Sequence, residues 1–206
     1  MHRSQGRKPS WLLRTLTVAI FALTPLTGSH AAAGPAIAED GIVTLRGDPA
    51  AEAEEREALF VDLAKAANGA EATEISSKIW ALWFRAPDAE AAALMTEALE
   101  LRGARDYHAA LTALDKLVEA TPDWAEGWNQ RATVRYVLRD FEGSLADIDR
   151  VLALEPKHFG ALSGQALILM HQGKMEAGQL VLRKAVEIDP FLSERALIMG
   201  PAGRDI

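Results

Sequence analysis

Three prolines at a fixed interval constrain the fold of this chain more than any other feature. Pro122, Pro156 and Pro190 follow one another at intervals of 34 residues, and each ends a stretch in which apolar residues recur at helical spacing. The stretches read YHAALTALDKLVEATP, FEGSLADIDRVLALEP and MEAGQLVLRKAVEIDP. Self-similarity at one fixed period indicates an array of stacked repeats rather than a domain with a single layered core. The sequence therefore predicts three consecutive units in register.

Each unit is predicted to fold as two antiparallel helices. Both halves carry apolar residues at i, i+3, i+4 and i+7, and Gly103, Arg139-Asp140 and Gly173 mark a short turn between the halves. Small side chains recur at the eighth and twentieth places, where two helices approach closely only if both side chains are short. The eighth place holds Ala98, Ala132 and Ala166, and the twentieth holds Ala110, Ser144 and Gly178. Large apolar residues recur at three other places. These are Leu94, Trp128 and Leu162 at the fourth; Tyr107, Phe141 and Met175 at the seventeenth; and Leu114, Ile148 and Leu182 at the twenty-fourth.

This pattern resembles the tetratricopeptide repeat (TPR) family. The middle unit matches the family's 34-residue pattern with Trp128, Ala132, Phe141, Ser144 and Pro156. The resemblance covers residues 91–190 and implies three repeats, at 91–124, 125–158 and 159–192. It implies an all-α fold, an α-solenoid of TPR helix hairpins wound into a right-handed superhelix. The chain departs from the family pattern at Arg131 and Arg135, in places that are usually apolar, and at Gly178, in place of an alanine.

Two further segments flank the repeats. Residues 50–87 contain two amphipathic helical patterns broken at Asn68-Gly69, which we interpret as a degenerate TPR-like hairpin, either a divergent first repeat or an amino-terminal cap. Within this segment, Trp80 and Trp83 are interpreted as core and cap aromatics rather than as a ligand cage. Residues 193–206 are predicted to be a short capping helix and tail.

The amino terminus has the pattern of a secretory signal peptide. Residues 1–33 combine a basic start, an apolar stretch from Thr15 to Leu26, and Ala31 and Ala33 spaced as in a cleavage site. The apolar stretch spans about 12 residues, against about 20 in a membrane-spanning helix. We therefore predict cleavage and export to the periplasm, with an uncleaved N-terminal membrane anchor as the alternative. Residues 34–49 would then be a flexible leader, and the chain resembles small exported TPR proteins of alphaproteobacteria.

Charge and composition exclude several classes of function. Removing residues 1–33 takes away four basic residues and no acidic one, which leaves 18 basic residues against 29 acidic ones. This excess disfavours nucleic acid or an anionic membrane as a partner. The chain has no cysteine, which excludes disulfides and thiol nucleophiles. It also lacks the H-E-x-x-H, P-loop and G-x-S-x-G patterns, so we expect no metal, no cofactor and no catalysis.

Polar residues in unusual places were considered for chemistry as well. His108, His158 and His171 are interpreted as surface or capping residues, because no ligand spacing connects them. A hydrolase would need a convergent set of titratable groups, and Glu126 and His171 are where such a set would have to lie. At the start of the middle repeat, Asp123 and Glu126 are predicted to form a capping box.

The resemblance implies that the first helices of the repeats line a concave groove. The carboxylate clamp of chaperone-binding members is absent, because Met95 and Leu99 stand where that clamp has lysine and asparagine. Asn129 and Tyr136 are predicted to face the groove, whereas the aliphatic and methionine positions fit packing between hairpins equally well. The predicted lining consists of Met95, Leu99, Arg102, Glu126, Asn129, Thr133, Tyr136, Ser163, Leu167, Met170 and His171.

Together these patterns predict a non-catalytic protein-interaction module. It would act as a scaffold or adaptor and bind a partner peptide or helix in the concave groove. The main alternative is a structural or assembly subunit of an envelope complex, permanently docked through the apolar helix of residues 75–84. An exposed Trp80 or Trp83 would favour that alternative. A hydrolase is the third and weakest interpretation.

Overall fold

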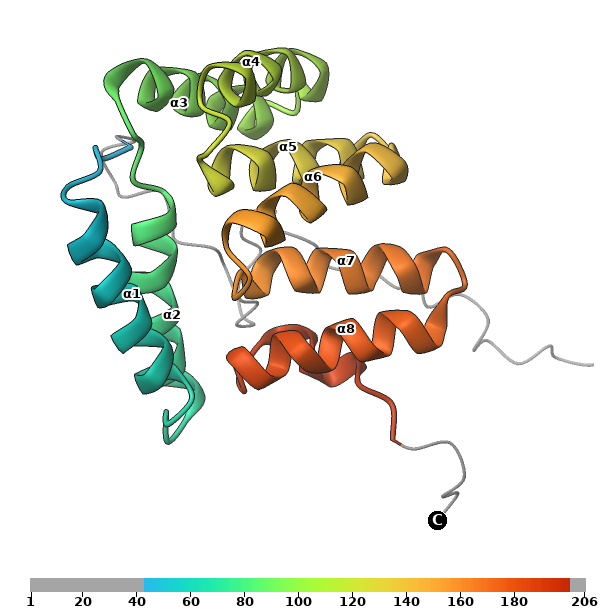
Figure 1. Ribbon diagram of the computed structural model, residues 1–206. Helices are drawn as coiled ribbons and strands as arrows, with labels where there is room; N and C mark the ends of the chain where they lie inside the picture. Colours follow the sequence, from blue (N-terminus) through green and yellow to red (C-terminus); the bar gives the residue numbers. More distant parts are fainter. Residues whose placement is uncertain (1–42, 201–206) are drawn as a thin grey trace, which may run out of the picture.

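The computed structural model describes residues 43–200, and within them the chain forms eight α-helices and one short 3₁₀ helix (Figure 1). The predicted signal peptide, most of the predicted leader and the last six residues lie outside the described residues. The elements are α1 (Pro49–Leu63), α2 (Gly69–Trp83), α3 (Ala89–Gly103), α4 (Tyr107–Ala120), α5 (Ala125–Val137), α6 (Phe141–Leu154), α7 (Phe159–His171), α8 (Met175–Ile188) and η1 (Ser193–Leu197).

The helices α3 to α8 form three antiparallel hairpins stacked in chain order (Figure 1). Each hairpin packs its two helices together, and α4 contacts α5 just as α6 contacts α7, so every repeat touches the next. Nearest-neighbour stacking of this kind is how solenoids bury a continuous core. The predicted all-α fold, an α-solenoid of helix hairpins, is confirmed.

The turn inside each hairpin repeats one backbone conformation. Arg105 and Arg139 have φ of 62° and 66°, and Gly173 has φ of 79° at the corresponding place. The following amide closes the turn, as when the Asp140 N–H donates to the carbonyl oxygen of Arg135 at 2.9 Å. A left-handed residue at a helix end is usually glycine, because other residues pay a steric cost there. Two of the three turns therefore carry arginine at a strained position.

The small-residue columns lie where the two helices of each hairpin cross. Ser144 is buried and its hydroxyl donates to the carbonyl oxygen of Ala132 at 2.8 Å, on the facing helix. A Cβ placed on Gly178 would lie 2.8 Å from the carbonyl oxygen of Ala166, and it would also overlap Cγ of Met170. The departure from alanine at Gly178 thus follows from a closer helix crossing in the third repeat.

The two arginines that depart from the family pattern share one buried carboxylate. Asp147 on α6 is buried, and it pairs with Arg131 at 2.7 Å and with Arg135 at 3.0 Å. Arg131 also reaches Asp115 on α4 at 3.0 Å. Bidentate arginine–carboxylate bonding satisfies the charge that burial would otherwise make costly. An ion-pair cluster therefore replaces part of the apolar packing between the first two repeats.

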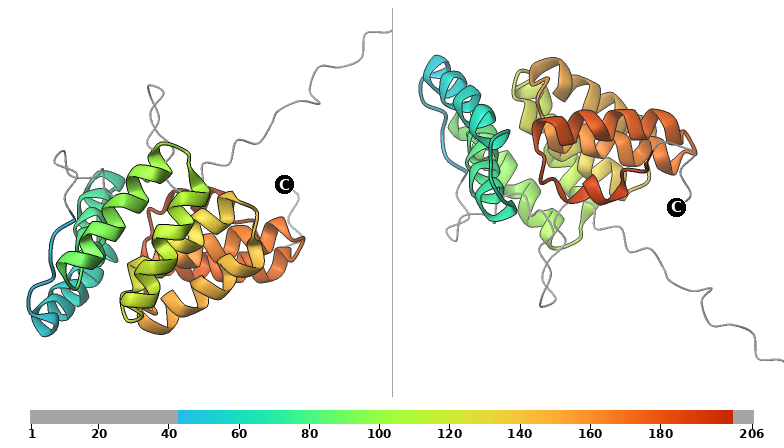
Figure 2. Two further views of the ribbon diagram at one scale, coloured as in Figure 1. Left: turned by 90° about the horizontal axis from the view of Figure 1, so that it is seen from above. Right: turned by 90° about the horizontal axis from the view of Figure 1, so that it is seen from below.

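The hairpin α1–α2 does not continue the stack. Its apolar side chains, including Phe60, Ile79 and Trp83, form one core with Phe159 and Leu182 of the last repeat, whereas α3 and α4 belong to a separate core. Figures 1 and 2 show the hairpin running across one side of the repeats, past the ends of α5, α7 and α8. The segment before α1 pairs with the α2–α3 connection through an isolated bridge between Leu45 and Ala86, and Val43 packs against the core of α3 and α4.

The start of α5 differs from the prediction. The N-cap of α5 is Trp124, which makes no side-chain capping bond, so the predicted capping box of Asp123 and Glu126 is wrong. Trp124 is 2% exposed and donates its indole Nε1–H to the carbonyl oxygen of Trp83 at 2.8 Å. Trp128 is only partly buried, and the guanidinium of Arg131 lies 4.7 Å from its ring centre. Trp128, placed in a large apolar column by the sequence, packs at the margin of a core, and Trp124 is the more deeply buried of the two tryptophans.

Candidate functional site

Glu126 is the centre of a buried polar network on the first helices of the repeats. Its side chain is fully buried, and a carboxylate in that setting needs several donors. The amide of Asn129 donates to it at 3.1 Å, the amide of Gln130 donates to the same oxygen, and Nε2 of His158 lies 3.2 Å from the other oxygen. The network ties α5 to the residue that begins α7.

His158 is held in one tautomer by two bonds. Its Nδ1 accepts the backbone N–H of Ala161 at 3.1 Å and so caps α7, which leaves the proton on Nε2 to be donated to Glu126. The imidazole stacks on the indole of Trp83 at 3.9 Å with 13° between the planes, and Trp80 meets it edge-on. The side chain is fully buried, so the surface role considered for His158 is wrong, and its capping role is confirmed.

Arg102 extends the network to the first repeat. Its guanidinium donates to the side-chain oxygen of Gln130, which in turn bonds Glu126. Burial lowers the pKa of Arg102, and the charge of Glu126 opposes this. One chain of hydrogen bonds therefore joins α3, α5 and the start of α7, which are the three helices predicted to line the groove.

The predicted groove residues of the first two repeats fall into two groups. Met95 and Leu99 are buried in the core formed by α3 and α4. Asn129 and Thr133 are also buried, and the Thr133 hydroxyl donates to the backbone oxygen of Asn129 at 2.9 Å. Since the Asn129 amide nitrogen bonds Glu126, only its oxygen is left for another donor. Tyr136 is partly exposed, and burial raises the pKa of its hydroxyl.

In the third repeat the predicted lining has two apolar and two polar residues, which differ in exposure. Ser163 and Leu167 are buried, and no hydrogen-bond partner of the Ser163 hydroxyl is found among the described residues. Met170 is partly exposed and leans on α8, where its sulfur lies 3.4 Å from the Gln179 amide nitrogen. His171 is exposed, and its ring lies 4.8 Å from that of Phe141 on α6.

The clustered titratable groups do not support the hydrolase interpretation. Both nitrogens of His158 are engaged, one by a backbone N–H and the other by Glu126. The oxygens of Glu126 accept from two side-chain amides and from the imidazole. A general base needs a free lone pair within reach of a substrate, and here the lone pairs are occupied. Among residues 43–200, no group of histidines and carboxylates is arranged to hold a metal ion.

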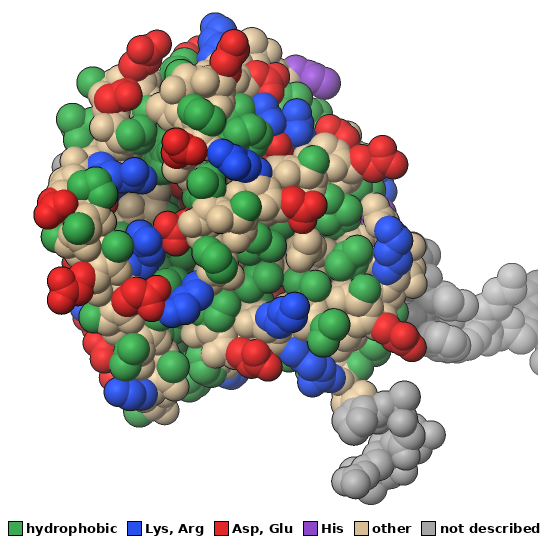
Figure 3. All heavy atoms as spheres, in the orientation of Figure 1, with side chains coloured by type: hydrophobic (Ala, Val, Ile, Leu, Met, Phe, Trp, Pro, Cys, Tyr) green, Lys and Arg blue, Asp and Glu red, His purple; other side chains and the backbone are tan. Residues whose placement is uncertain are grey.

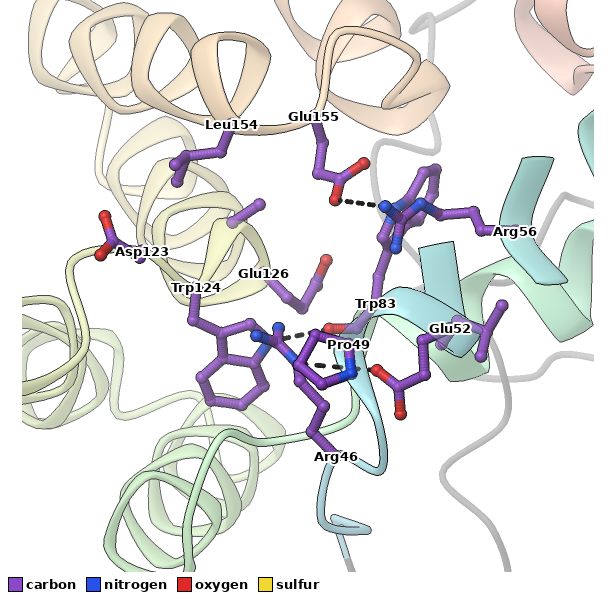
Figure 4. A pocket seen from close by; sticks show the side chains of 12 residues that line it. Arg46, Pro49, Glu52, Arg56, Trp83, Asp123, Trp124, Glu126, Leu154 and Glu155 are labelled. Carbon is purple, nitrogen blue, oxygen red and sulfur yellow. Dashed lines mark hydrogen bonds and ion pairs between the residues drawn. The ribbon is translucent and has the colours of Figure 1, made fainter. Parts of the chain in front are cut away.

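A cavity of about 170 Å³ lies where α1–α2 meets the repeats (Figure 4). Figure 4 shows Arg56 directed at Glu155 and Arg46 directed at Glu52, at 3.0 Å and 3.6 Å respectively. Glu126 lines the cavity as well, with its oxygens engaged in the network described above. Because these charges are already matched within the chain, the cavity is part of the seam between hairpin and repeats. The lining consists of Arg46, Pro49, Glu52, Arg56, Leu82, Trp83, Asp123, Trp124, Ala125, Glu126, Leu154 and Glu155.

The outer surface carries charges of both signs. On the face drawn in Figure 3, acidic and basic side chains alternate with hydrophobic ones, and no continuous basic area is visible there. A phosphate-binding face would gather lysine and arginine in one place. None of the helices that the structure describes is long and apolar enough to cross a bilayer.

The sequence contained an overlooked signal for the buried histidine. Trp124, His158 and Leu192 are spaced by 34 residues, and all three are buried, at 2%, 0% and 5% exposure. A histidine in a column that otherwise holds tryptophan and leucine indicates a buried polar residue, which needs a partner.

Comparison with known proteins gives sequence relatives of one kind. No family profile matches the chain. A TPR repeat-containing protein of Rhizobium etli is 31% identical over 178 residues, which cover 86% of this chain and 87% of that protein. Tetratricopeptide repeat protein 36 of Mus musculus is 28% identical over 117 residues, which cover 52% of this chain and 62% of the mouse protein.

Two solved structures are similar at low sequence identity. The TPR2B domain of yeast Sti1, in complex with pHsp70, is 20% identical and covers 53% of this chain and 90% of its own, with a TM-score of 0.49. The RS-1 MamA ArsTM double mutant is 21% identical and covers 70% of this chain and 77% of its own, with a TM-score of 0.46.

Proposed function

The chain belongs to the tetratricopeptide repeat family, and on that premise we propose that it is a non-catalytic interaction module that binds a segment of another protein on its concave face. Membership supports the general role, because members of this family act as protein-interaction modules. The finer assignment, to the face formed by α3, α5 and α7, is supported by the network centred on Glu126.

That network is the observation that carries the proposal. Arg102, Glu126 and His158 connect the first helices of all three repeats through buried hydrogen bonds. Side chains fixed in this way hold the concave face in one shape before a partner arrives. A preformed surface loses less conformational entropy on binding, which raises affinity without any additional contact.

The chemistry of the face fits a segment that combines apolar side chains with hydrogen-bond donors. Tyr136 and Met170 are partly exposed and offer aromatic and thioether contact surface. The Tyr136 hydroxyl is the polar group left to meet a partner, because Asn129 is 1% exposed and its amide nitrogen is bonded to Glu126. A backbone N–H or a side-chain donor of the partner would meet this hydroxyl.

We propose further that the protein is exported to the periplasm and loses residues 1–33. The support is the sequence pattern alone, with its basic start, apolar stretch and cleavage-like alanines. Cell fractionation with amino-terminal sequencing tests this proposal. A mature chain that begins near Gly34 in the periplasmic fraction agrees with it, and a chain that begins at Met1 in the cytoplasm contradicts it.

Co-purification from the native host tests the binding face. Partners recovered with the wild-type chain should be lost from Asn129→Ala combined with Tyr136→Ala. Tyr136→Ala alone serves as a second variant, because Tyr136 is outside the Glu126 network and its loss leaves that network intact. Thr112→Ala with Lys116→Ala, both exposed on α4, is the matched control. Equal recovery by wild type and both groove variants would refute the assignment of the concave face.

A further inference from the structure

We propose that the hairpin α1–α2 is a latch across the three repeats, and that its closure is coupled to the concave face through Glu126 and His158. This inference rests on the proposed function, since it assigns a regulatory element to the same face. The hairpin meets every repeat at an equivalent place, one of these contacts requires a close fit, and that contact is bonded to the concave face.

The latch meets the last place of each repeat. Trp124 donates its indole N–H to the carbonyl oxygen of Trp83, His158 stacks on the Trp83 ring, and Leu192 belongs to the same core as Phe60 and Ile79. These three residues close the three repeats at the same position in each. One hairpin thus spans the turns between repeats, which are the points where the curvature of a solenoid is set.

The fit at the centre of the latch is tight. A Cβ placed on Gly160 would lie 2.6 Å from the Trp80 ring, so only glycine allows α2 to approach the start of α7 this closely. Around this contact, Arg56 pairs with Glu155 at 3.0 Å, and Lys157 pairs with Glu57 on α1. Apolar burial and peripheral ion pairs together close the hairpin on the repeats.

The same contact is joined to the concave face by hydrogen bonds. The path runs from Asn129 to Glu126 at 3.1 Å, from Glu126 to His158 at 3.2 Å, and from His158 to Trp83 by stacking at 3.9 Å. A shift of α5 that moves the buried Asn129 therefore changes the position of the imidazole on which Trp83 rests. By thermodynamic reciprocity, opening the latch changes the affinity of the concave face to the same extent.

Hydrogen–deuterium exchange of the full chain tests the coupling without any partner. Asn129→Ala removes one donor from Glu126, and exchange in α2 should become at least about 10-fold faster, as expected for the loss of one hydrogen bond to a charged group. Exchange in α4, which belongs to a different core, should stay within twofold of wild type. Thr133→Val is the matched control, because Thr133 lies one turn further along α5 and bonds only the helix backbone.

A second variant approaches the latch from the opposite side. Gly160→Ala pushes against Trp80 and leaves every member of the network in place, and it should raise exchange in α2 and at the start of α5 together. Unchanged exchange in α2 for Asn129→Ala overturns the coupling, as does an equal rise in α4, which would indicate general destabilisation. The exchange assay uses no ligand, so a negative result contradicts the latch without contradicting the proposed binding role. Failed co-purification contradicts the binding role without contradicting the latch.

Discussion

Replacing Gly178 by alanine sets two opposite effects against each other, and the structure indicates which is larger. Alanine in a helix interior is favoured over glycine by about 1 kcal/mol, and alanine is also the usual residue of the family at this place. In this chain, however, the added methyl group would lie 2.8 Å from the Ala166 carbonyl oxygen and would overlap Met170. Overpacking of this kind costs about 1–3 kcal/mol, so Gly178→Ala should lower the free energy of unfolding, by up to about 2 kcal/mol once the propensity gain is subtracted.

The assay is urea denaturation followed by circular dichroism at constant protein concentration. Gly127→Ala is the matched control, because Gly127 is also buried within a helix but a Cβ there would meet Leu117 at an ordinary 3.5 Å. This control should be more stable than wild type by about 0.5–1 kcal/mol. Gly178→Ala combined with Met170→Ala should still not recover the stability that Met170→Ala has alone, because the clash with the backbone oxygen remains. A Gly178→Ala protein more stable than wild type, as expected for Gly127→Ala, would refute this account of the helix crossing.

Three further predictions concern stability. Arg105→Gly and Arg139→Gly should each raise the free energy of unfolding by about 0.5–1 kcal/mol, because glycine has no Cβ and adopts a positive φ without steric cost. Gly173→Ala should lower the free energy of unfolding for the same reason. A stabilised Gly173→Ala would contradict the explanation. Asp147→Asn should lower the free energy of unfolding by about 1–3 kcal/mol, because a neutral amide replaces the carboxylate that Arg131 and Arg135 share. Asp149→Asn, at an exposed site of the same helix, should have little effect. Burial raises the pKa of Asp189, so its charged carboxylate opposes folding above that pKa. Asp189→Asn should therefore be more stable than wild type at pH 7, and the difference in stability should shrink as the pH falls. An equal difference between the two proteins at pH 7 and at pH 4 would disprove this explanation.

The repeat architecture could be predicted because its causes are local. Pro122 and Pro156 end helices by removing a backbone donor, and the small side chains of Ala110 and Ser144 permit the crossing of two helices next to each other in sequence. These causes recur at every repeat, so one misread residue does not destroy the pattern. The structure of each hairpin is therefore largely encoded within the 34 residues that form it.

The capping box failed for a physical reason. The local sequence favoured Asp123 as the cap with Glu126 reaching back to it, and nothing nearby in sequence opposed this. In the fold, Glu126 bonds Asn129, Gln130 and His158 instead. His158 is 32 residues away in sequence, so the competing partner was outside any local window. A buried carboxylate gains more from three donors than from one exposed capping bond.

The placement of α1–α2 could not be read from the sequence, because its partners follow about a hundred residues later. Lys157 and Glu57, for example, are 100 residues apart. An amphipathic pattern predicts that one face of a helix will be buried, but it does not predict which surface will cover that face. A degenerate first repeat and a latch across the repeats require the same periodicity in residues 50–87, so the pattern alone does not distinguish them.

The last place of the repeat, by contrast, contained the information needed to find the latch. Trp124, His158 and Leu192 follow the three closing prolines by two positions, and a histidine in a column with tryptophan and leucine indicates a buried polar residue that needs partners. Trp124 is buried in the core of α3, α4 and α5, whereas His158 and Leu192 are covered by α1–α2, and Trp83 touches both Trp124 and His158. The column therefore marks the places where α1–α2 meets the repeats, although its burial has a share from the repeats themselves.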